Sequence, residues 1–235
     1  MATLTVLALA ACSSPSGPRG VTSEEADRLS EVFFTNFDNE GAHFVLNAAP
    51  TPGTAMVIEG EVDFVEAQGY AVVSATGSDA PVHGVIFSEA VVLENMPQLV
   101  DLAATAGQQP FTWVARPFDS TAYQLDSLLG VLLGLSVQQR ENPLLLEQAG
   151  VQWLREDAVN GVAVDVFEFS PQVRLWVETG GTRLLRFEGN SSTLDRPIVI
   201  DLSEPGPVTL PLVEEADVVQ VADVQDLYDA VRSGA

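Results

Sequence analysis

The sequence contains no lysine and only two histidines, so its ten basic residues are all arginine. Aspartate and glutamate together number 33, which gives a formal net charge of −23 at pH 7. Binding to nucleic acid needs a basic surface that neutralises phosphate, and attraction to anionic lipid head groups needs basic clusters. The charge therefore argues against a nucleic-acid partner and against membrane docking by surface charge alone.

Cysteine is nearly absent too, since Cys12 is the only one. The chain can form no internal disulfide, and a cysteine-based metal or redox site is not expected. His43 and His83 lie in strand-like segments, and the sequence has no P-loop, dinucleotide-binding loop, zinc-protease motif or nucleophile elbow. We therefore expect no catalytic activity, no metal and no cofactor.

Long apolar runs are missing as well. The longest, Leu128–Leu135, is far shorter than the roughly 20 residues of a membrane-spanning helix, so we expect a chain that can be anchored to a membrane but does not cross it. With 46% hydrophobic residues the chain can nevertheless build a sizeable core, as one large domain or two small ones.

The N-terminus carries an export pattern. Leu4–Ala11 is apolar and ends in small residues directly before Cys12, and Leu9-Ala10-Ala11-Cys12 resembles the bacterial lipobox, in which the cysteine is lipidated and becomes the mature N-terminus. The expected organisation is a signal peptide over residues 1–11 and a lipidated Cys12 with a flexible tether over 12–23. This places the protein on the extracytoplasmic face of the cell membrane. The alternative is a short apolar strand with an incidental cysteine.

Hydrophobic periodicity predicts helices at both ends of the chain and in its middle. The first, over residues 24–37, begins after an N-cap at Ser23, and a leucine-rich helix covers about residues 123–135. Asn142-Pro143 begins a second short helix, and the segment around Val221–Arg232 is either a loosely attached helix or a frayed tail.

Two groups of strands separate these helices. The predicted strands are His43–Ala48, Thr54–Glu66, Tyr70–Thr76 and His83–Leu93, then Val151–Arg155, Val162–Phe169, Val173–Glu178, Arg183–Glu188 and Pro197–Leu202. Glu89 and Glu94 interrupt the fourth strand, which suggests a sheet edge or bend. Because strands and helices are segregated, we expect an α+β domain over residues 24–212, followed by an acidic C-terminal segment over 213–235. Its meandering strands favour one curved antiparallel sheet with helices covering the concave face.

A family resemblance rests on several of these features together: the lipobox, the opening helix, the leucine-rich helices with Asn142-Pro143-Leu144-Leu145, and the Leu175–Glu178 and Leu184–Glu188 strands around Gly180-Gly181. The chain resembles the LppX/LprG lipoprotein family and, more distantly, the LolA/LolB lipoprotein carriers. The resemblance implies a half-barrel sheet closed by helices around an apolar cavity that holds acyl chains.

If such a cavity exists, its lining should come from the apolar sides of the strands and the inner face of the leucine-rich helix. The predicted lining residues are Ile58, Val62, Phe64, Leu175, Val177, Leu185 and Phe187 on the sheet and Leu125, Leu128, Leu129 and Leu132 on the helix. The first hypothesis for function is thus a monomeric, membrane-anchored carrier or presenter of lipids, glycolipids or lipoproteins, with an envelope protein as a candidate partner. The second is a surface-displayed protein-interaction module of similar fold whose core is filled and which binds no lipid.

Overall fold

A computed structural model of the chain describes residues 17–49, 52–76, 82–190, 194 and 196–233. The described residues form one sheet of thirteen strands in the order β1-β8-β9-β10-β11-β12-β2-β3-β4-β5-β6-β7-β13. The strands are β1 (Arg19–Gly20), β2 (Gly41–Ala49), β3 (Ala55–Asp63), β4 (Gln68–Thr76), β5 (His83–Ser88), β6 (Val91–Asn95), β7 (Trp113–Pro117), β8 (Gln152–Val159), β9 (Val162–Ser170), β10 (Val173–Glu178), β11 (Leu184–Gly189), β12 (Arg196–Ser203) and β13 (Val218–Gln220).

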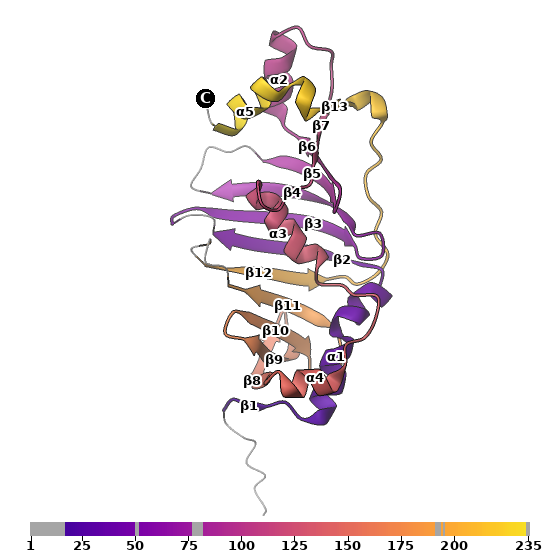
Figure 1. The fold of residues 1–235 in the computed structure, drawn as a ribbon, viewed down its shortest axis with the longest axis vertical. Coiled ribbons are helices and arrows are strands. Elements are labelled where there is room, and N and C mark those ends of the chain that lie inside the picture. The colour runs from indigo at the N-terminus through magenta and orange to yellow at the C-terminus, as the bar shows by residue number, and fades with distance from the viewer. Residues whose placement is uncertain (1–16, 50–51, 77–81, 191–193, 195, 234–235) are drawn as a thin grey trace, which may run out of the picture.

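The sheet consists of two antiparallel meanders placed side by side. Strands β2 to β7 follow one another in space as they do in sequence, and β8 to β12 do the same. The two meanders meet where β12 pairs with β2, and only the pair of β13 with β7 is parallel among the described strands. The predicted α+β class with an open, mainly antiparallel sheet is therefore confirmed (Figure 1).

Five α-helices and two short 3₁₀ turns complete the described part of the chain. They are α1 (Ser23–Asp38), α2 (Pro97–Thr105), α3 (Gln124–Leu133), α4 (Pro143–Gln148), η1 (Glu215–Asp217), η2 (Val221–Asp223) and α5 (Gln225–Ser233). None of the described helices has the length and hydropathy needed to span a bilayer.

The start of α1 differs by one residue from the sequence prediction. Thr22, not Ser23, is the N-cap: its hydroxyl accepts a hydrogen bond from the Glu25 backbone, and the Glu25 carboxylate accepts one from the Thr22 backbone. This reciprocal capping box satisfies two backbone donors that the first helical turn would otherwise leave unpaired. At α4 the predicted cap is confirmed, since Asn142 accepts a hydrogen bond from the Leu144 backbone and Pro143 opens the helix.

The helices α1, α3 and α4 pack on one face of the sheet. Leu29 and Val32 of α1, the leucines of α3 and Leu146 of α4 share a single buried cluster with inward-facing residues of β2 to β6 and β9 to β12. Figure 1 shows α3 lying across the central strands, with α1 and α4 towards the end that carries β1 and β8. We call this helix-covered side the inner face.

Strands β3 and β4 approach each other closely at Gly60. Gly60 pairs with Ala71 across β3 and β4, and a Cβ atom at Gly60 would overlap the Tyr70 carbonyl oxygen and come within 2.6 Å of Ala71 Cα. Only glycine fits this close approach of two backbones. It lies between the buried residues Ile58 and Val62, where a side chain would otherwise be expected.

Three parts of the fold differ from the sequence prediction. The expected strand His83–Leu93 is a hairpin, β5 and β6, with Glu89 in its turn, and helix α2 and strand β7 were not predicted. The C-terminal helix α5 is firmly attached, because Tyr228 is 1% exposed and belongs to a second cluster with residues of α2 and β7. The preceding β13 pairs with β7 and so extends the sheet.

Candidate functional site

The structure brings ten of the eleven predicted cavity residues together on the inner face. Nine are buried members of one cluster, and Phe187 is half-buried and packs against it. The nine are Ile58, Val62, Phe64, Leu125, Leu128, Leu129, Leu132, Leu175 and Val177. The alternation of apolar and charged residues along β3 and the helical spacing in α3 thus identified the inner face correctly.

Leu185 is the exception, because it lies on the opposite face of the sheet. It belongs to a separate cluster with Val164, Val166 and Trp176. The register between β10 and β11 shifts after Trp176, which pairs with Arg186, while Val177 pairs with Leu184. This β-bulge inserts one residue and reverses the alternation, so that Leu184 takes the inward position predicted for Leu185.

Most of the inner face is filled by close-packed side chains. Phe44, Phe87 and Phe167 are at most 1% exposed on it, and the rings of Phe44 and Phe87 meet edge-on at 6.4 Å between centroids. Leu129 and Leu132 of α3 are fully buried above the sheet. The sheet and α3 therefore do not enclose one large cavity along the length of the described inner face.

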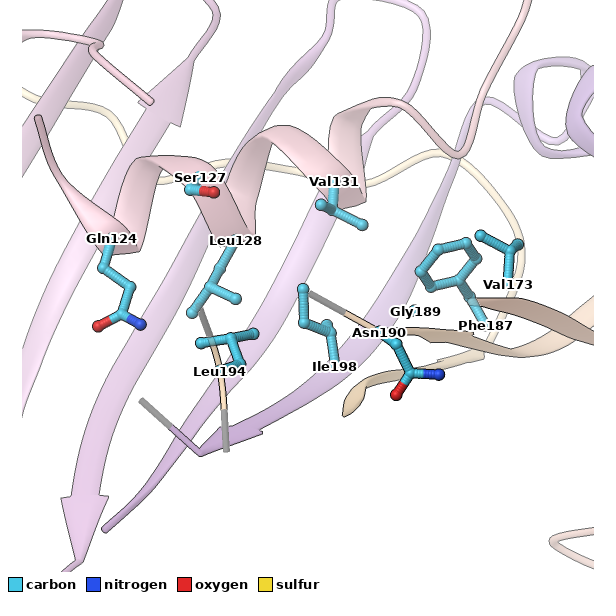
Figure 2. Close-up of a pocket in the computed structure, with 10 residues that line it drawn as sticks. All are labelled: Gln124, Ser127, Leu128, Val131, Val173, Phe187, Gly189, Asn190, Leu194 and Ile198. Carbon is cyan, nitrogen blue, oxygen red and sulfur yellow. The ribbon is translucent and has the colours of Figure 1, made fainter. Parts of the chain in front are cut away.

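A smaller pocket remains beside α3, with a volume of about 220 Å³. Its lining comes from α3, from β10 to β12 and from the segment between the last two strands. The residues are Gln124, Ser127, Leu128, Val131, Val173, Phe187, Gly189, Asn190, Leu194 and Ile198 (Figure 2). Of the predicted residues only Leu128 and Phe187 line it. The other predicted residues form the close-packed core or, for Leu185, lie on the far face.

The pocket combines an apolar interior with uncharged polar groups. Figure 2 shows Leu128 and Val131 of α3 facing Leu194, Ile198 and Phe187, while Gln124, Ser127 and Asn190 supply amide and hydroxyl groups. These groups can orient a bound molecule through hydrogen bonds without selecting a charged one.

Gly189 allows Phe187 to reach the pocket. A Cβ atom at Gly189 would lie 2.8 Å from Cε1 of the Phe187 ring. Gly189 ends β11 and Asn190 follows it, and turn residues at a strand end are the sequence signal that could have directed attention to this place. No such sequence signal marks the lining residues Val131, Val173 and Ile198. An isolated branched residue in a strand or helix is typical of an ordinary hydrophobic core.

A buried charged network lies at the N-terminal end of α3. The Arg116 guanidinium of β7 donates to Asp126 of α3 at 2.7 Å and to Glu94 of β6 at 2.7 Å, and all three side chains are at most 2% exposed. The Tyr228 hydroxyl of α5 donates to Glu94 at 2.8 Å. Glu94 therefore does not mark a sheet edge or bend, as its place in an apolar stretch suggested, but is the carboxylate that joins β6, β7 and α5.

The protonation states of this network follow from burial and pairing. Burial opposes the charged form of Arg116, but its hydrogen bonds to Asp126 and the charge of Glu94 outweigh burial and hold the Arg116 pKa above its ordinary value. Burial, reinforced by the Glu94 charge, raises the pKa of Tyr228 above its ordinary value. Arg116 is thus a permanent cation and Tyr228 a neutral donor, which suits a structural cross-link.

His43 has partners that superficially resemble a catalytic triad. Its Nδ1 lies 3.3 Å from the Ser203 hydroxyl, and its Nε2 lies 3.6 Å from Glu59. His43 and Ser203 are simply paired residues of β2 and β12, and Glu59 is 61% exposed. The three residues come together because β2 lies between β12 and β3 in the sheet.

Comparison with known proteins finds distant similarities to solved structures. No protein-family profile and no curated protein matches the chain. An uncharacterised conserved protein from Thermus thermophilus is 9% identical with a TM-score of 0.42, covering 83% of this chain and 99% of that one. A chain of the Pseudomonas aeruginosa MucA/MucB complex is 12% identical with a TM-score of 0.33, covering 83% and 60%. The LolA superfamily protein NE2245 from Nitrosomonas europaea is 12% identical with a TM-score of 0.28, covering 81% and 96%.

These similarities concern the arrangement of sheet and helices alone. They do not assign the chain to the LppX/LprG family, and we infer no ligand from them.

Proposed function

We propose that this protein is a lipoprotein, anchored through Cys12 to the extracytoplasmic face of the cell membrane, that binds an acyl chain of a lipid or glycolipid and presents or carries it in the envelope. The observation that supports binding is the pocket beside α3, with its apolar interior and its uncharged polar groups at Gln124, Ser127 and Asn190. We propose a binding role without catalysis and a monomeric protein. Cys12 and the signal segment lie outside the described residues.

The pocket volume limits the ligand. Pockets for drug-sized molecules measure about 300–1,000 Å³, so 220 Å³ suits part of one acyl chain and not several chains. Each buried methylene contributes about 0.8 kcal/mol, and a short segment of chain is therefore enough for weak binding. The absence of a charged group among the described lining residues makes binding tolerant of the head group.

The test is a substitution that fills the pocket without disturbing the core. Val131 is half-buried and lines the pocket, whereas Leu129 is fully buried in the core and would be a poor choice. Val131→Trp should weaken binding of a fluorescent fatty acid by at least about tenfold, since displacing two methylenes already costs that much. Val72→Trp, at a 38% exposed position outside the pocket, is the matched control and should bind normally. Equal binding by both variants would contradict the pocket as the site.

The anchor is tested separately. Cys12→Ala should move the full-length protein from the membrane fraction to the soluble fraction, because the thiol carries the lipid. A variant that stays in the membrane fraction would refute lipidation, whatever the outcome for the pocket.

A protein-interaction module without a lipid ligand is the second candidate, and the packed inner face favours it. Phe44, Phe87 and Phe167 occupy the place that a large acyl cavity would need. Native mass spectrometry of protein gently extracted from membranes distinguishes the two functions. A retained lipid mass that disappears in Val131→Trp supports the carrier, and a bare protein mass together with no fatty-acid binding supports the module.

A further inference from the structure

At one end of the molecule, residues near the end of the N-terminal tether pair with the strand that follows helix α4. The two residues of β1 pair with β8, with Arg19 opposite Trp153 and Gly20 opposite Gln152. The next residue, Val21, donates its backbone N–H to the Val151 carbonyl at 3.3 Å. Val151 follows α4 almost directly in sequence, and Figure 1 shows β1, β8 and α4 together at this end.

The position of Arg19 is fixed by contacts beyond the strand pairing. Its guanidinium donates to both carboxylate oxygens of Glu25 at 2.7 Å and stacks over the Trp153 ring at 4.7 Å. The chain therefore leaves the folded domain at a defined point beside α4.

Helix α4 turns two consecutive leucines towards the outside. Leu144 is 61% exposed and Leu145 is 60% exposed, while their neighbour Leu146 is 6% exposed and holds the helix to the core. The two adjacent leucines therefore leave apolar surface in contact with water, and this surface does not contribute to the hydrophobic core. Exposed leucines elsewhere in the described chain, such as Leu102 at 39%, are single.

Charge is distributed unevenly between the two ends. Eight of the ten arginines lie in residues 19–28 and 140–196, the parts of the chain that form α1, β1 and β8 to β12 or flank α4. The other two, Arg116 and Arg232, lie at the α2–α5 end and interact with Glu94. The same two segments contain twelve acidic residues, so their net charge is −4, against −19 for the rest of the chain. Approach to an anionic membrane surface is therefore less unfavourable for this part of the molecule than for the opposite end.

From these observations we infer that Leu144 and Leu145 insert into the interface of the bilayer to which Cys12 anchors the chain. This inference rests on the proposed lipid anchor. The seven residue-to-residue steps from Cys12 to Arg19 span at most about 25 Å, so the anchor holds the exit point, and α4 beside it, within that distance of the bilayer. The tether makes the contact intramolecular, and a weak apolar contact is then enough to orient the domain.

A bilayer fits this surface better than a protein partner does. A specific protein interface buries about 1,200 Å² or more with complementary shape, and two leucines on a helix of six residues offer much less. Insertion into a bilayer interface requires no shape complementarity, and its strength depends on the apolar area that is buried.

The experiment uses the full-length, lipidated protein in phosphatidylcholine vesicles. An environment-sensitive fluorophore is attached to a single introduced cysteine, either Glu147→Cys on the exposed side of α4 or Leu102→Cys on α2 at the opposite end. A lipidated Cys12 has no free thiol, so the label reports one place only. Each reporter is compared with and without the paired substitution Leu144→Ser/Leu145→Ser, which removes exposed side chains and should leave the unfolding midpoint unchanged.

We expect a blue shift of the Glu147→Cys reporter on reconstitution, loss of that shift in Leu144→Ser/Leu145→Ser, and no shift of the Leu102→Cys reporter. A protein that floats with the vesicles while its α4 label stays in water overturns the inference and leaves the anchor intact. A protein that does not float with the vesicles overturns both. A shift that persists without the two leucines also overturns the inference, because the contact then comes from other residues.

Discussion

Removing the cation from the buried network should cost more stability than removing any exposed arginine. In Arg116→Met, Glu94 and Asp126 lose their common partner while their side chains remain 2% and 0% exposed. Breaking a buried pair by removing one member costs about 3–5 kcal/mol, because the remaining charge stays desolvated. Against a total stability of about 5–15 kcal/mol this is a large fraction. The melting temperature should fall by roughly 10 °C for a chain of this length.

Urea unfolding measures the loss, and Arg174→Met provides the control. Arg174 also contacts two carboxylates, Glu168 and Glu188, but its side chain is 39% exposed. Exposed pairs contribute about 0–1 kcal/mol, so the control should lie close to the wild type. The number of ion pairs is the same in both cases, and the comparison isolates the effect of burial.

A triple variant separates a buried charge from a lost packing contact. Glu94→Gln/Arg116→Met/Asp126→Asn removes all three charges at nearly constant volume and should recover most of the stability lost in Arg116→Met. Equal stability of Arg116→Met and Arg174→Met would refute the reasoning. A triple variant no more stable than Arg116→Met would instead assign the loss to packing.

Three further changes test local features. Glu25→Gln keeps an oxygen that can cap the helix but removes the charge that pairs with Arg19, so it should cost up to about 1 kcal/mol at pH 7. The hydrogen bond from Arg19 lowers the Glu25 pKa below its ordinary value of 4.5, so this stabilisation is present above pH 4.5 and the difference from wild type in urea midpoint should shrink as the pH falls below it. Gly60→Ala should destabilise strongly, by about 3 kcal/mol or more, because its Cβ would overlap the backbone of β4, and normal thermal unfolding would contradict the close approach. Leu129→Trp should lose its cooperative unfolding transition, since Leu129 is fully buried, and a folded variant with lipid bound would show room that the structure lacks.

Periodicity was sufficient to predict most elements and the face that each strand buries. Alternation in β3 placed Ile58 and Val62 inside, and the helical spacing of Leu125, Leu128 and Leu132 identified the inner side of α3. Turn and cap residues such as Asn142 and Pro143 located the start of α4. These features depend on neighbours in the sequence, and local pattern is enough to reveal them.

Features that depend on partners distant in sequence could not be predicted in this way. The bulge beside Trp176 changes the face of Leu185, and nothing in the alternation of β11 marks it. In the sequence, Glu94 only interrupts an apolar stretch, and its structural role is not visible. Its network partners Arg116 and Asp126 lie 22 and 32 positions further along the chain. The pocket likewise depends on where α3 crosses the sheet, which no residue pattern specifies.

The two ends of the molecule differ in how their edge strands are covered and in what they expose. At the α2–α5 end the exposed edge of β7 is covered by β13, and Arg116 ties β6, β7 and α3 together while Glu94 adds α5. At the α4 end, β1 covers only Gln152 and Trp153 of β8, and two leucines remain in water. The pocket lies between these ends, against the middle of α3. For the proposed anchored carrier, this order would keep the α2–α5 end away from the membrane and place the pocket between that end and the bilayer.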